Sequence, residues 1–395
     1  MRAHVLVLVS SYVTAADPRR GVKFREDLLH YRARGWKVGL VAVSQLGAGL
    51  IQLGRRGSLM SWSDEAGAPV LQSYLFSSLL NPVLRRLNHS AASAALHWSG
   101  LTAVKAYIRR HGRPDLIHAH GTFGPGEVAL TVQHRLGIPY VLTEHISHFL
   151  KENALSSKMV ERALPVVADA ALRMPVSGAV GMNMEATFGE AMRPWTPVPN
   201  IVDCRFLQLP LSERGDGNFV VFSVSYLTSK KRPEVLVRAF AEAFAGQQAE
   251  LRLGGDGPEV ETIKSLVQEL GVASQITLLG PLSREDVARE MERCSVYALS
   301  SEVETFGIPV IEAMAAGKPV VATLCGGPDE LIDETNGILV DVGSVSDFAS
   351  GLIAIRDGYA LYDQRQIRAN CEARFSSEAV LREIEKIYEH YGASA

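Results

Sequence analysis

Cysteines and long apolar runs are both scarce in this chain of 395 residues. The four cysteines lie far apart, with no CxxC pair and no Cys/His spacing typical of a zinc site: Cys204, Cys294, Cys325 and Cys371. The sequence therefore indicates neither a disulfide framework nor a zinc module, and we expect reduced thiols in a cytoplasmic protein. The apolar run His4–Val9 lacks a cleavage site behind it, and no 20-residue stretch is apolar enough to cross a bilayer.

Charge is divided unevenly along the chain. Residues 1–200 contain 22 Lys and Arg against 13 Asp and Glu, whereas residues 201–395 contain 18 against 30. A basic half suggests an anionic partner, and nucleic acid, anionic lipid and a phosphate-bearing acceptor all fit. The alternative is a drift of surface charge with no partner, because charge governs association and not fold.

The length exceeds one ordinary core and fits two domains of about 150–200 residues each. Short β-branched runs that do not alternate are typical of strands buried on both faces, hence of a parallel sheet covered by helices. Such runs alternate with helical patterns, first in one series and then, after a break, in a second series: His4–Ser10, Lys37–Ser44, Pro114–His120, Pro139–His145 and Arg173–Ser177; then Asn218–Ser225, Ala249–Gly257, Gln275–Gly280, Cys294–Ser301, Pro319–Thr323 and Gly337–Asp341. The sequence predicts an α/β protein with two doubly wound, Rossmann-like domains.

The break between the two series has the proline, glycine and polar residues of a linker. We therefore expect an N-terminal domain at 1–200, a C-terminal domain at 201–375 and a last helix at 376–395 that packs back on the first domain. Segment Gln72–Arg110 interrupts the rhythm and is interpreted as two helices. Helices of the core and helices that touch a membrane are the alternatives for it.

One stretch, SSEVETFGIPVIEAMAAGKPVVAT at Ser300–Thr323, places chemistry at the end of a strand. A loop follows the predicted strand, and a helix is expected to begin near Pro309 and to end before Gly317. Ligands of open α/β sheets bind outside the carboxyl ends of strands. The backbone amides around 306–308, at the positive end of that helix, would form a seat for phosphate.

Two carboxylates flank this seat. Glu304 is expected on the loop and Glu312 in the first helical turn, where a carboxylate can accept hydrogen bonds from the vicinal hydroxyls of a ribose. Phosphate and diol together indicate a nucleotide or a nucleotide-sugar. A helix that acidic residues stabilise near its start, without any ligand, is the alternative.

The same stretch resembles the E-x7-E signature of retaining glycosyltransferases of family 4, which have the GT-B fold. Further motifs follow in the order of that family and extend the resemblance over nearly the whole chain: DLIHAHG at Asp115–Gly121, VLTEH at Val141–His145, VPNIVD at Val198–Asp203, SYLTSKKRPEVLVRAFA at Ser225–Ala241, LGGDGPE at Leu253–Glu259 and CGGPDELIDETNGILV at Cys325–Val340.

The resemblance implies roles in binding the donor. Glu312 would bind the donor ribose, and Glu304 would contact the donor sugar or order the loop. The amides near Phe306, Gly307 and Ile308 would contact sugar and phosphates, while Lys231 would neutralise the anionic diphosphate that leaves. A solvated lysine at a helix start is the alternative for Lys231.

The chain departs from the family at one position. The family usually has an arginine five residues before this lysine, and here the residue is Tyr226. We expect Lys230 or Arg232 to compensate for the missing cation.

In the first half of the chain, the resemblance places His145 opposite the reacting sugar. A histidine that only satisfies its own polar groups at a strand end is the alternative. Gly21 matches the glycine of the loop after the first strand, which would approach donor phosphates or acceptor; mere loop flexibility is the alternative there.

No metal and no cofactor are expected. Asp-x-Asp, the usual metal–diphosphate motif of the other large glycosyltransferase fold, is absent, and LGGDG is not the G-x-G-x-x-G of a nicotinamide site. We place His118 and His120 on opposite faces of their predicted strand, and so expect that they do not share a metal.

The sequence thus predicts a retaining, metal-independent glycosyltransferase of the hexosyl type. The second domain would hold a nucleoside-diphosphate sugar, and the first a hydroxyl acceptor of polysaccharide or lipid-linked glycan synthesis. A phosphorylated or lipid-linked acceptor and an anionic membrane surface are expected as partners, and nucleic acid is not. Two alternatives stay open: a nucleotide-sugar epimerase of GT-B fold, and a non-catalytic partner protein that binds nucleotide-sugar.

Overall fold

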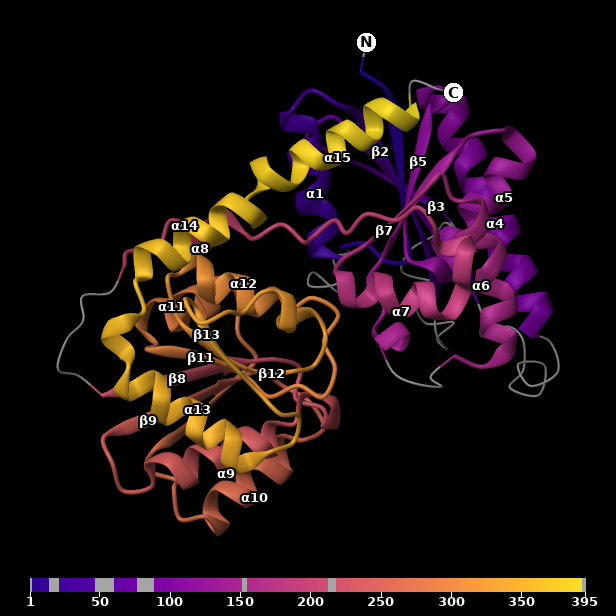
Figure 1. Ribbon diagram of the computed structural model, residues 1–395. Coiled ribbons are helices and arrows are strands. Elements are labelled where there is room, and N and C mark those ends of the chain that lie inside the picture. The colour runs from indigo at the N-terminus through magenta and orange to yellow at the C-terminus, as the bar shows by residue number, and fades with distance from the viewer. Residues whose placement is uncertain are drawn as a thin grey trace. The chain divides into compact units, whose positions relative to one another are not determined.

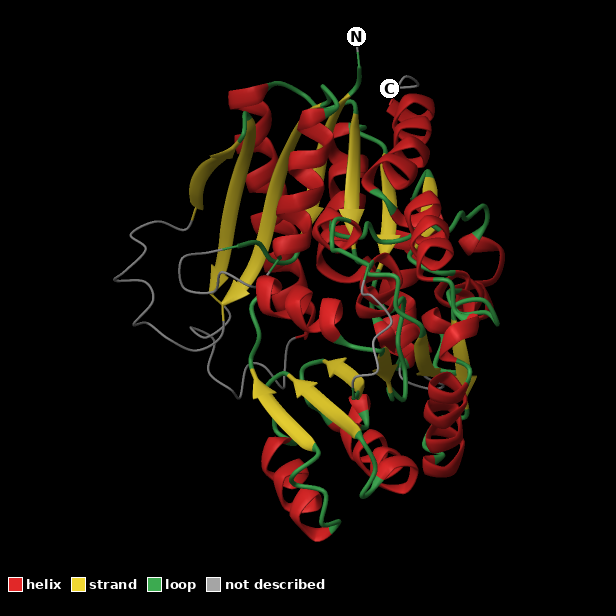
Figure 2. Ribbon diagram, turned by 90° about the vertical axis from the view of Figure 1, so that its left-hand side faces the viewer, coloured by secondary structure: helices red, strands yellow, loops and turns green. Residues whose placement is uncertain are grey.

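The computed structural model describes residues 2–13, 21–46, 60–76, 89–150, 155–211 and 218–392. The chain divides into two compact units (Figure 1). Unit 1 comprises Met1–Val176, Gly181–Val198 and Leu381–Ala395, and unit 2 comprises Ser177–Val180 and Pro199–Val380. Each unit contains its own sheet, largely parallel in unit 1 and wholly parallel in unit 2, with helices against it, which confirms the predicted α/β class (Figure 2).

Unit 1 is built on a seven-stranded sheet of order β3-β4-β2-β1-β5-β6-β7. All described neighbours are parallel except β3, which is antiparallel to β4. The strands are β1 His4–Val9, β2 Lys37–Leu46, β3 Met60–Glu65, β4 Ala68–Phe76, β5 Leu116–His120, β6 Tyr140–Glu144 and β7 Leu172–Pro175. The helices are α1 Val22–Ala33, α4 His89–His111, α5 Glu127–Leu136, α6 Ser157–Asp169 and α7 Gly178–Phe188, with short turns at Thr122–Gly126, Ser147–Leu150 and Gly189–Met192.

Unit 2 repeats the architecture with a six-stranded, all-parallel sheet of order β10-β9-β8-β11-β12-β13. Its strands are β8 Phe219–Val224, β9 Ala249–Gly254, β10 Ile276–Gly280, β11 Val296–Leu299, β12 Val320–Thr323 and β13 Gly337–Val340. The helices are α8 Cys204–Leu207, α9 Pro233–Phe244, α10 Val260–Glu269, α11 Arg284–Arg293, α12 Ile308–Ala315, α13 Val345–Asp357 and α14 Gln364–Phe375, with short turns at Ser229–Lys231, Gly327–Glu330 and Tyr359–Leu361.

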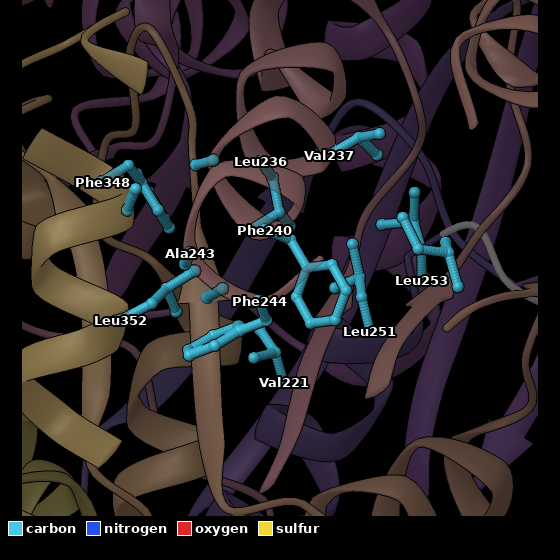
Figure 3. Close-up of a cluster of buried hydrophobic side chains, with 14 of the residues drawn as sticks. Val221, Leu236, Val237, Phe240, Ala243, Phe244, Leu251, Leu253, Phe348 and Leu352 are labelled. Carbon is cyan, nitrogen blue, oxygen red and sulfur yellow. The ribbon is translucent and has the colours of Figure 1, made fainter. Parts of the chain in front are cut away.

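The core of unit 2 lies between its sheet and the helices α9, α10 and α13, and Figure 3 shows part of it. Phe240 and Phe244 of α9 and Phe348 of α13 are fully buried, and they pack in one cluster with Val221 of β8 and Leu251 of β9. Burial of an aromatic or aliphatic side chain of this size contributes about 1.5–3 kcal/mol. Val296 and Ala298 of β11 belong to the same cluster, so it packs against both β8 and β11.

The last helix, α15 at Ser377–Gly392, reaches unit 1 with its C-terminal part. The Glu385 carboxylate there accepts hydrogen bonds from Nε and Nη2 of Arg34 at 2.8 and 2.9 Å and from Nε1 of Trp36 at 2.8 Å. These bonds, the Arg34 guanidinium above all, lower the pKa of Glu385 to about 2. None of the helices in the described ranges is both long and apolar enough to span a membrane.

The interpretation of Gln72–Arg110 as two helices is wrong in its first part. Residues from Gln72 to Phe76 end strand β4, which pairs with β2 and β3, whereas the later part forms the single helix α4. A tight β3–β4 turn at Ala66 and Gly67, with φ of 50° and 84°, turns the chain back, and Asp64 accepts a hydrogen bond from the Gly67 amide at 2.7 Å. Residues 77–88, including Arg85 and Arg86, lie outside the described residues.

Candidate functional site

The loops after β8 and β11 bring two predicted site residues into contact. The ammonium group of Lys231 forms an ion pair with the Glu304 carboxylate, although 73 residues separate them. The two loops are tied through their backbones as well: the Glu302 amide donates to the Lys230 carbonyl at 2.8 Å, and Ser300 Oγ donates to the Lys231 carbonyl at 2.9 Å. The parallel sheet explains this meeting, since β8 and β11 are neighbours and end at the same edge.

The backbone of Glu304 is fixed by the loop that follows β12. Its amide donates to the Cys325 carbonyl at 2.9 Å, and its carbonyl accepts from the Gly327 amide at 2.7 Å. A Cβ at Gly327 would lie 2.3 Å from the Cα of Phe306, so only glycine allows this approach. Glu304 is therefore held on both sides before any ligand arrives.

The predicted phosphate seat forms the start of α12. Gly307 caps this helix with a φ of 95°, and Ile308 is its first residue. The Phe306 side chain is buried, and its ring centroid lies 5.8 Å from that of Phe375. The side chain therefore packs in the interior of unit 2. Since α12 begins at Ile308, Glu312 lies in the second turn and not, as predicted, in the first.

Glu312 is not open to solvent in this structure. Only 1% of the residue is exposed, and its Oε1 lies 2.7 Å from Nη1 of Arg284, the first residue of α11. The other terminal nitrogen of Arg284 lies 3.2 Å from Oδ2 of Asp203, and the guanidinium lies 5.1 Å from the Phe206 ring centroid. Burial opposes the charge of Arg284, but the carboxylates of Glu312 and Asp203 raise its pKa overall.

Sequence reasoning missed Arg284 as part of this group. Asp203 lies in the VPNIVD motif and Glu312 in the E-x7-E motif, but nothing local marks their common partner on α11. The three residues come together because α8 packs on both α11 and α12 in unit 2.

The other predicted cations lie beside Lys231. Lys230 is exposed, whereas Arg232 is partly exposed and lies 3.6 Å from the Glu302 carboxylate. Tyr226, which replaces the family arginine, is 66% exposed. Its backbone is anchored on both sides, because the amides of Ser225 and Leu227 donate to the carbonyls of Gly254 and Asp256 at 3.2 and 2.8 Å.

In unit 1, His145 follows β6 and contacts a second imidazole. Its Nε2 lies 3.0 Å from Nδ1 of His120 on β5, and the two rings are nearly parallel, with centroids 5.3 Å apart. Phe24 of α1 approaches both rings with edge-to-face geometry. Burial, aided by the positive charge of Lys23, lowers the pKa of His145 well below its ordinary value, so the ring is neutral at pH 7.

A buried carboxylate holds the backbone of His145. Glu144, 1% exposed, accepts the amides of His145 and Ile146 on Oε1 at 2.7 and 2.8 Å. Its Oε2 accepts the amide and the hydroxyl of Thr122 at 2.8 and 2.5 Å. Burial raises the pKa of Glu144, while these hydrogen bonds oppose the rise. Apart from its place in the VLTEH motif, nothing in the sequence marks Glu144 as this anchor.

The predicted orientation of His118 and His120 is wrong. Residues two apart on a strand point to the same face, and the two ring centroids are only 4.1 Å apart. His118 is nevertheless bonded at both nitrogens, to the Tyr388 hydroxyl at 2.6 Å and to Oγ1 of Thr143 at 2.7 Å. Within the described ranges, no group of three or more His, Cys, Asp or Glu residues is arranged to hold a metal ion.

Gly21 precedes α1 in unit 1, with a φ of 78°. A Cβ there would lie 2.8 Å from the Ser11 carbonyl oxygen, so the position requires glycine. The structure thus places Gly21 and His145 in unit 1 and the remaining predicted site residues in unit 2.

Comparisons with known proteins find matches for both units. The model of Glycosyltransferase Family 4 matches residues 30–206, and that of Glycosyl transferases group 1 matches residues 211–370. A D-inositol 3-phosphate glycosyltransferase of Mycolicibacterium smegmatis is 28% identical over 269 residues, which cover 62% of this chain and 60% of that enzyme.

Two solved structures show the same fold. Sucrose-phosphate synthase from Thermosynechococcus elongatus superposes with a TM-score of 0.78 at 20% identity, covering 99% of this chain and 100% of the other. Anabaena HepE in complex with UDP has a TM-score of 0.72 at 21% identity, covering 97% and 99%. The fold is therefore GT-B, and the chain belongs to glycosyltransferase family 4, as its motifs predict.

Proposed function

We propose that the protein transfers a sugar from a nucleoside-diphosphate sugar to a hydroxyl acceptor with retention of the anomeric configuration. The observation that carries this proposal is the Lys231–Glu304 pair at the adjoining carboxyl ends of β8 and β11. A cation held there in advance stabilises the negative charge that develops on the departing diphosphate, without a metal ion. Glu304 orients this cation and orders the loop.

Donor binding involves the remaining residues of unit 2. The amides of Phe306, Gly307 and Ile308 contact phosphate or sugar at the start of α12, and Glu312 binds the ribose hydroxyls. Because Arg284 covers the Glu312 carboxylate in this structure, its side chain, 40% exposed, has to turn aside when the ribose enters. HepE was solved with UDP, so a uridine diphosphate sugar is the first donor to test.

Unit 1 holds the acceptor. His145 faces the reacting sugar, and Gly21 allows the loop after the first strand to approach the donor phosphate or the acceptor closely. The departing phosphate helps to deprotonate the incoming hydroxyl on the same face of the sugar. The basic charge of residues 1–200 and the D-inositol 3-phosphate glycosyltransferase relative both support a phosphorylated acceptor, lipid-linked or free.

Tyr226 favours a second candidate, a non-catalytic protein that binds nucleotide-sugar. A neutral, exposed phenol stands where the family has a cation, so less charge faces the diphosphate. Such a protein would bind the donor without releasing nucleoside diphosphate.

The test offers a panel of nucleotide-sugars to the protein, each with and without a lipid-phosphate extract, and measures released nucleoside diphosphate. We expect release from one donor, only with the extract, and a loss of at least 100-fold in kcat for Lys231→Ala. Lys264→Ala is the matched control, because Lys264 is exposed on α10 and, among the described residues, pairs only with the nearby Glu261. Donor binding without turnover in any extract would favour the non-catalytic protein, and full activity of Lys231→Ala would contradict the site.

A further inference from the structure

Within the described residues, the side chain of His145 hydrogen-bonds to another imidazole and to no carboxylate or carbonyl, although Glu144 accepts its backbone amide. Nε2 of His145 and Nδ1 of His120 are 3.0 Å apart. A neutral imidazole has one nitrogen that donates and one that accepts. The bond therefore requires that one of these two nitrogens carries a hydrogen and that the other does not, so the tautomers of the two rings are coupled.

His120 is a rigid partner. The residue is 7% exposed, and its ring is packed against the ring of His118 at 4.1 Å and the edge of Phe24 at 5.0 Å. His118 is itself fixed, because the Tyr388 hydroxyl and Thr143 Oγ1 bind its two nitrogens. The ring of His120 therefore has little freedom to turn away from His145.

Both imidazoles of the pair are neutral. Burial lowers the pKa of His120 and of His145 well below the ordinary value, and the positive charge of Lys23 acts in the same direction on both. A single hydrogen is thus shared between the two facing nitrogens. Within the described residues, the remaining nitrogen of His145, Nδ1, makes no hydrogen bond.

We propose that His120 is a positioning residue for His145. It fixes the orientation of the His145 imidazole and selects one of its two neutral tautomers, so that Nδ1 is the nitrogen that a sugar hydroxyl meets, always in the same protonation state. This inference rests on the proposed function, in which His145 faces the reacting sugar. The ring pair itself exists without any substrate, and it can be observed directly.

The experiment records long-range 1H–15N spectra of the 15N-histidine-labelled full chain, without substrate. In the wild type we expect His145 to show one nitrogen of protonated character and one of bare character, the signature of a single tautomer. In His120→Phe, which keeps an aromatic ring but removes the bond, the two His145 nitrogens should move toward a common, averaged position. His120→Asn should restore the single tautomer, because an amide places a polar atom where Nδ1 of histidine lies.

Kinetics provide the second readout. Loss of one neutral hydrogen bond that positions a reacting group should lower kcat about 10-fold in His120→Phe. The KM for the donor should change less than about 2-fold, because the change affects the transition state and not ground-state binding. The control is Tyr107→Phe, which removes a 2.8 Å hydrogen bond from another buried histidine of unit 1, His4, and should leave His145 and kcat unchanged.

An averaged His145 tautomer in the wild type, or an unchanged His145 spectrum in His120→Phe, would overturn the inference. If His120→Phe does not fold, the wild-type spectrum and His120→Asn decide it, since Asn must preserve both the single tautomer and kcat within about 3-fold. Failure of the proposed function is separate: it would appear as absence of donor turnover in a wild type whose His145 spectrum still shows one tautomer.

Discussion

Replacing Arg284 by methionine should destabilise unit 2 measurably. The change leaves the Glu312 carboxylate, 1% exposed, without the cation that lies 2.7 Å from it. Removing one partner of a buried ion pair costs about 3–5 kcal/mol, whereas an exposed pair contributes about 0–1 kcal/mol. Because the Arg284 side chain is 40% exposed, we expect an intermediate loss of about 2 kcal/mol. For a unit of this size, that corresponds to a fall in Tm of about 4–8 °C.

The assay is a double-mutant cycle with Glu312→Gln, measured by calorimetry or circular dichroism. The double variant should regain more than half of the loss, because the buried charge is gone together with its partner. All four tryptophans lie in unit 1: Trp36, Trp62, Trp98 and Trp195. Tryptophan fluorescence therefore reports the unfolding of unit 1 separately from that of unit 2.

Arg289→Met serves as the control for the loss of an arginine from the same helix. Its side chain is 70% exposed and pairs with Asp286, so the expected change is below about 1 kcal/mol. A variant Arg284→Met as stable as Arg289→Met, or a coupling energy below about 0.5 kcal/mol, would show that Arg284 does not stabilise the buried Glu312 carboxylate.

Three further outcomes are expected. Glu312→Ala should weaken donor binding at least 10-fold in calorimetric titration, since two charge-assisted hydrogen bonds to a ribose are lost; unchanged binding would mean that the ribose lies elsewhere. Lys231→Arg should recover only part of the activity lost in Lys231→Ala, because a planar guanidinium does not reproduce the point charge of an ammonium group; full recovery would argue against a fixed geometry. Glu385 has a folded-state pKa of about 2, below the ordinary value, so its contribution is complete above about pH 4.5 and is lost as the pH falls toward 2. The free energy of unfolding of Glu385→Gln, measured with denaturant, should therefore fall less than that of the wild type between about pH 4.5 and pH 2. An equal fall in both proteins would contradict the low pKa of Glu385.

Sequence patterns predicted most of the architecture because buried parallel strands have a strong signal. β1 is fully buried over His4–Val9, and the two series of apolar runs correspond to the two sheets. The β3–β4 hairpin was missed because Met60–Glu65 (MSWSDE) is largely polar and nowhere fully buried, so it lacks the apolar run that marks a buried parallel strand. A turn made by Ala66 and Gly67 has no strong sequence signal, since alanine rarely adopts a positive φ.

The contacts within the candidate site were predictable where they follow strand ends and unpredictable where distant helices contribute to them. Lys231 and Glu304 meet because neighbouring parallel strands end together. Two contacts depend on helix packing that no local pattern encodes. Arg284 covers Glu312, and the Tyr388 hydroxyl binds His118 from 270 residues away. The orientation of His118 and His120 was a different kind of error, since the two-residue period of a strand already determines it.

Retention is tested by following the reaction by 1H NMR from its start, with the donor and acceptor found active in the panel. We expect the first product to carry the sugar in the same anomeric configuration as the donor. We also expect an equal amount of nucleoside diphosphate and no effect of a chelator. A first product of opposite configuration, or a changed sugar without any acceptor, would contradict a retaining glycosyltransferase.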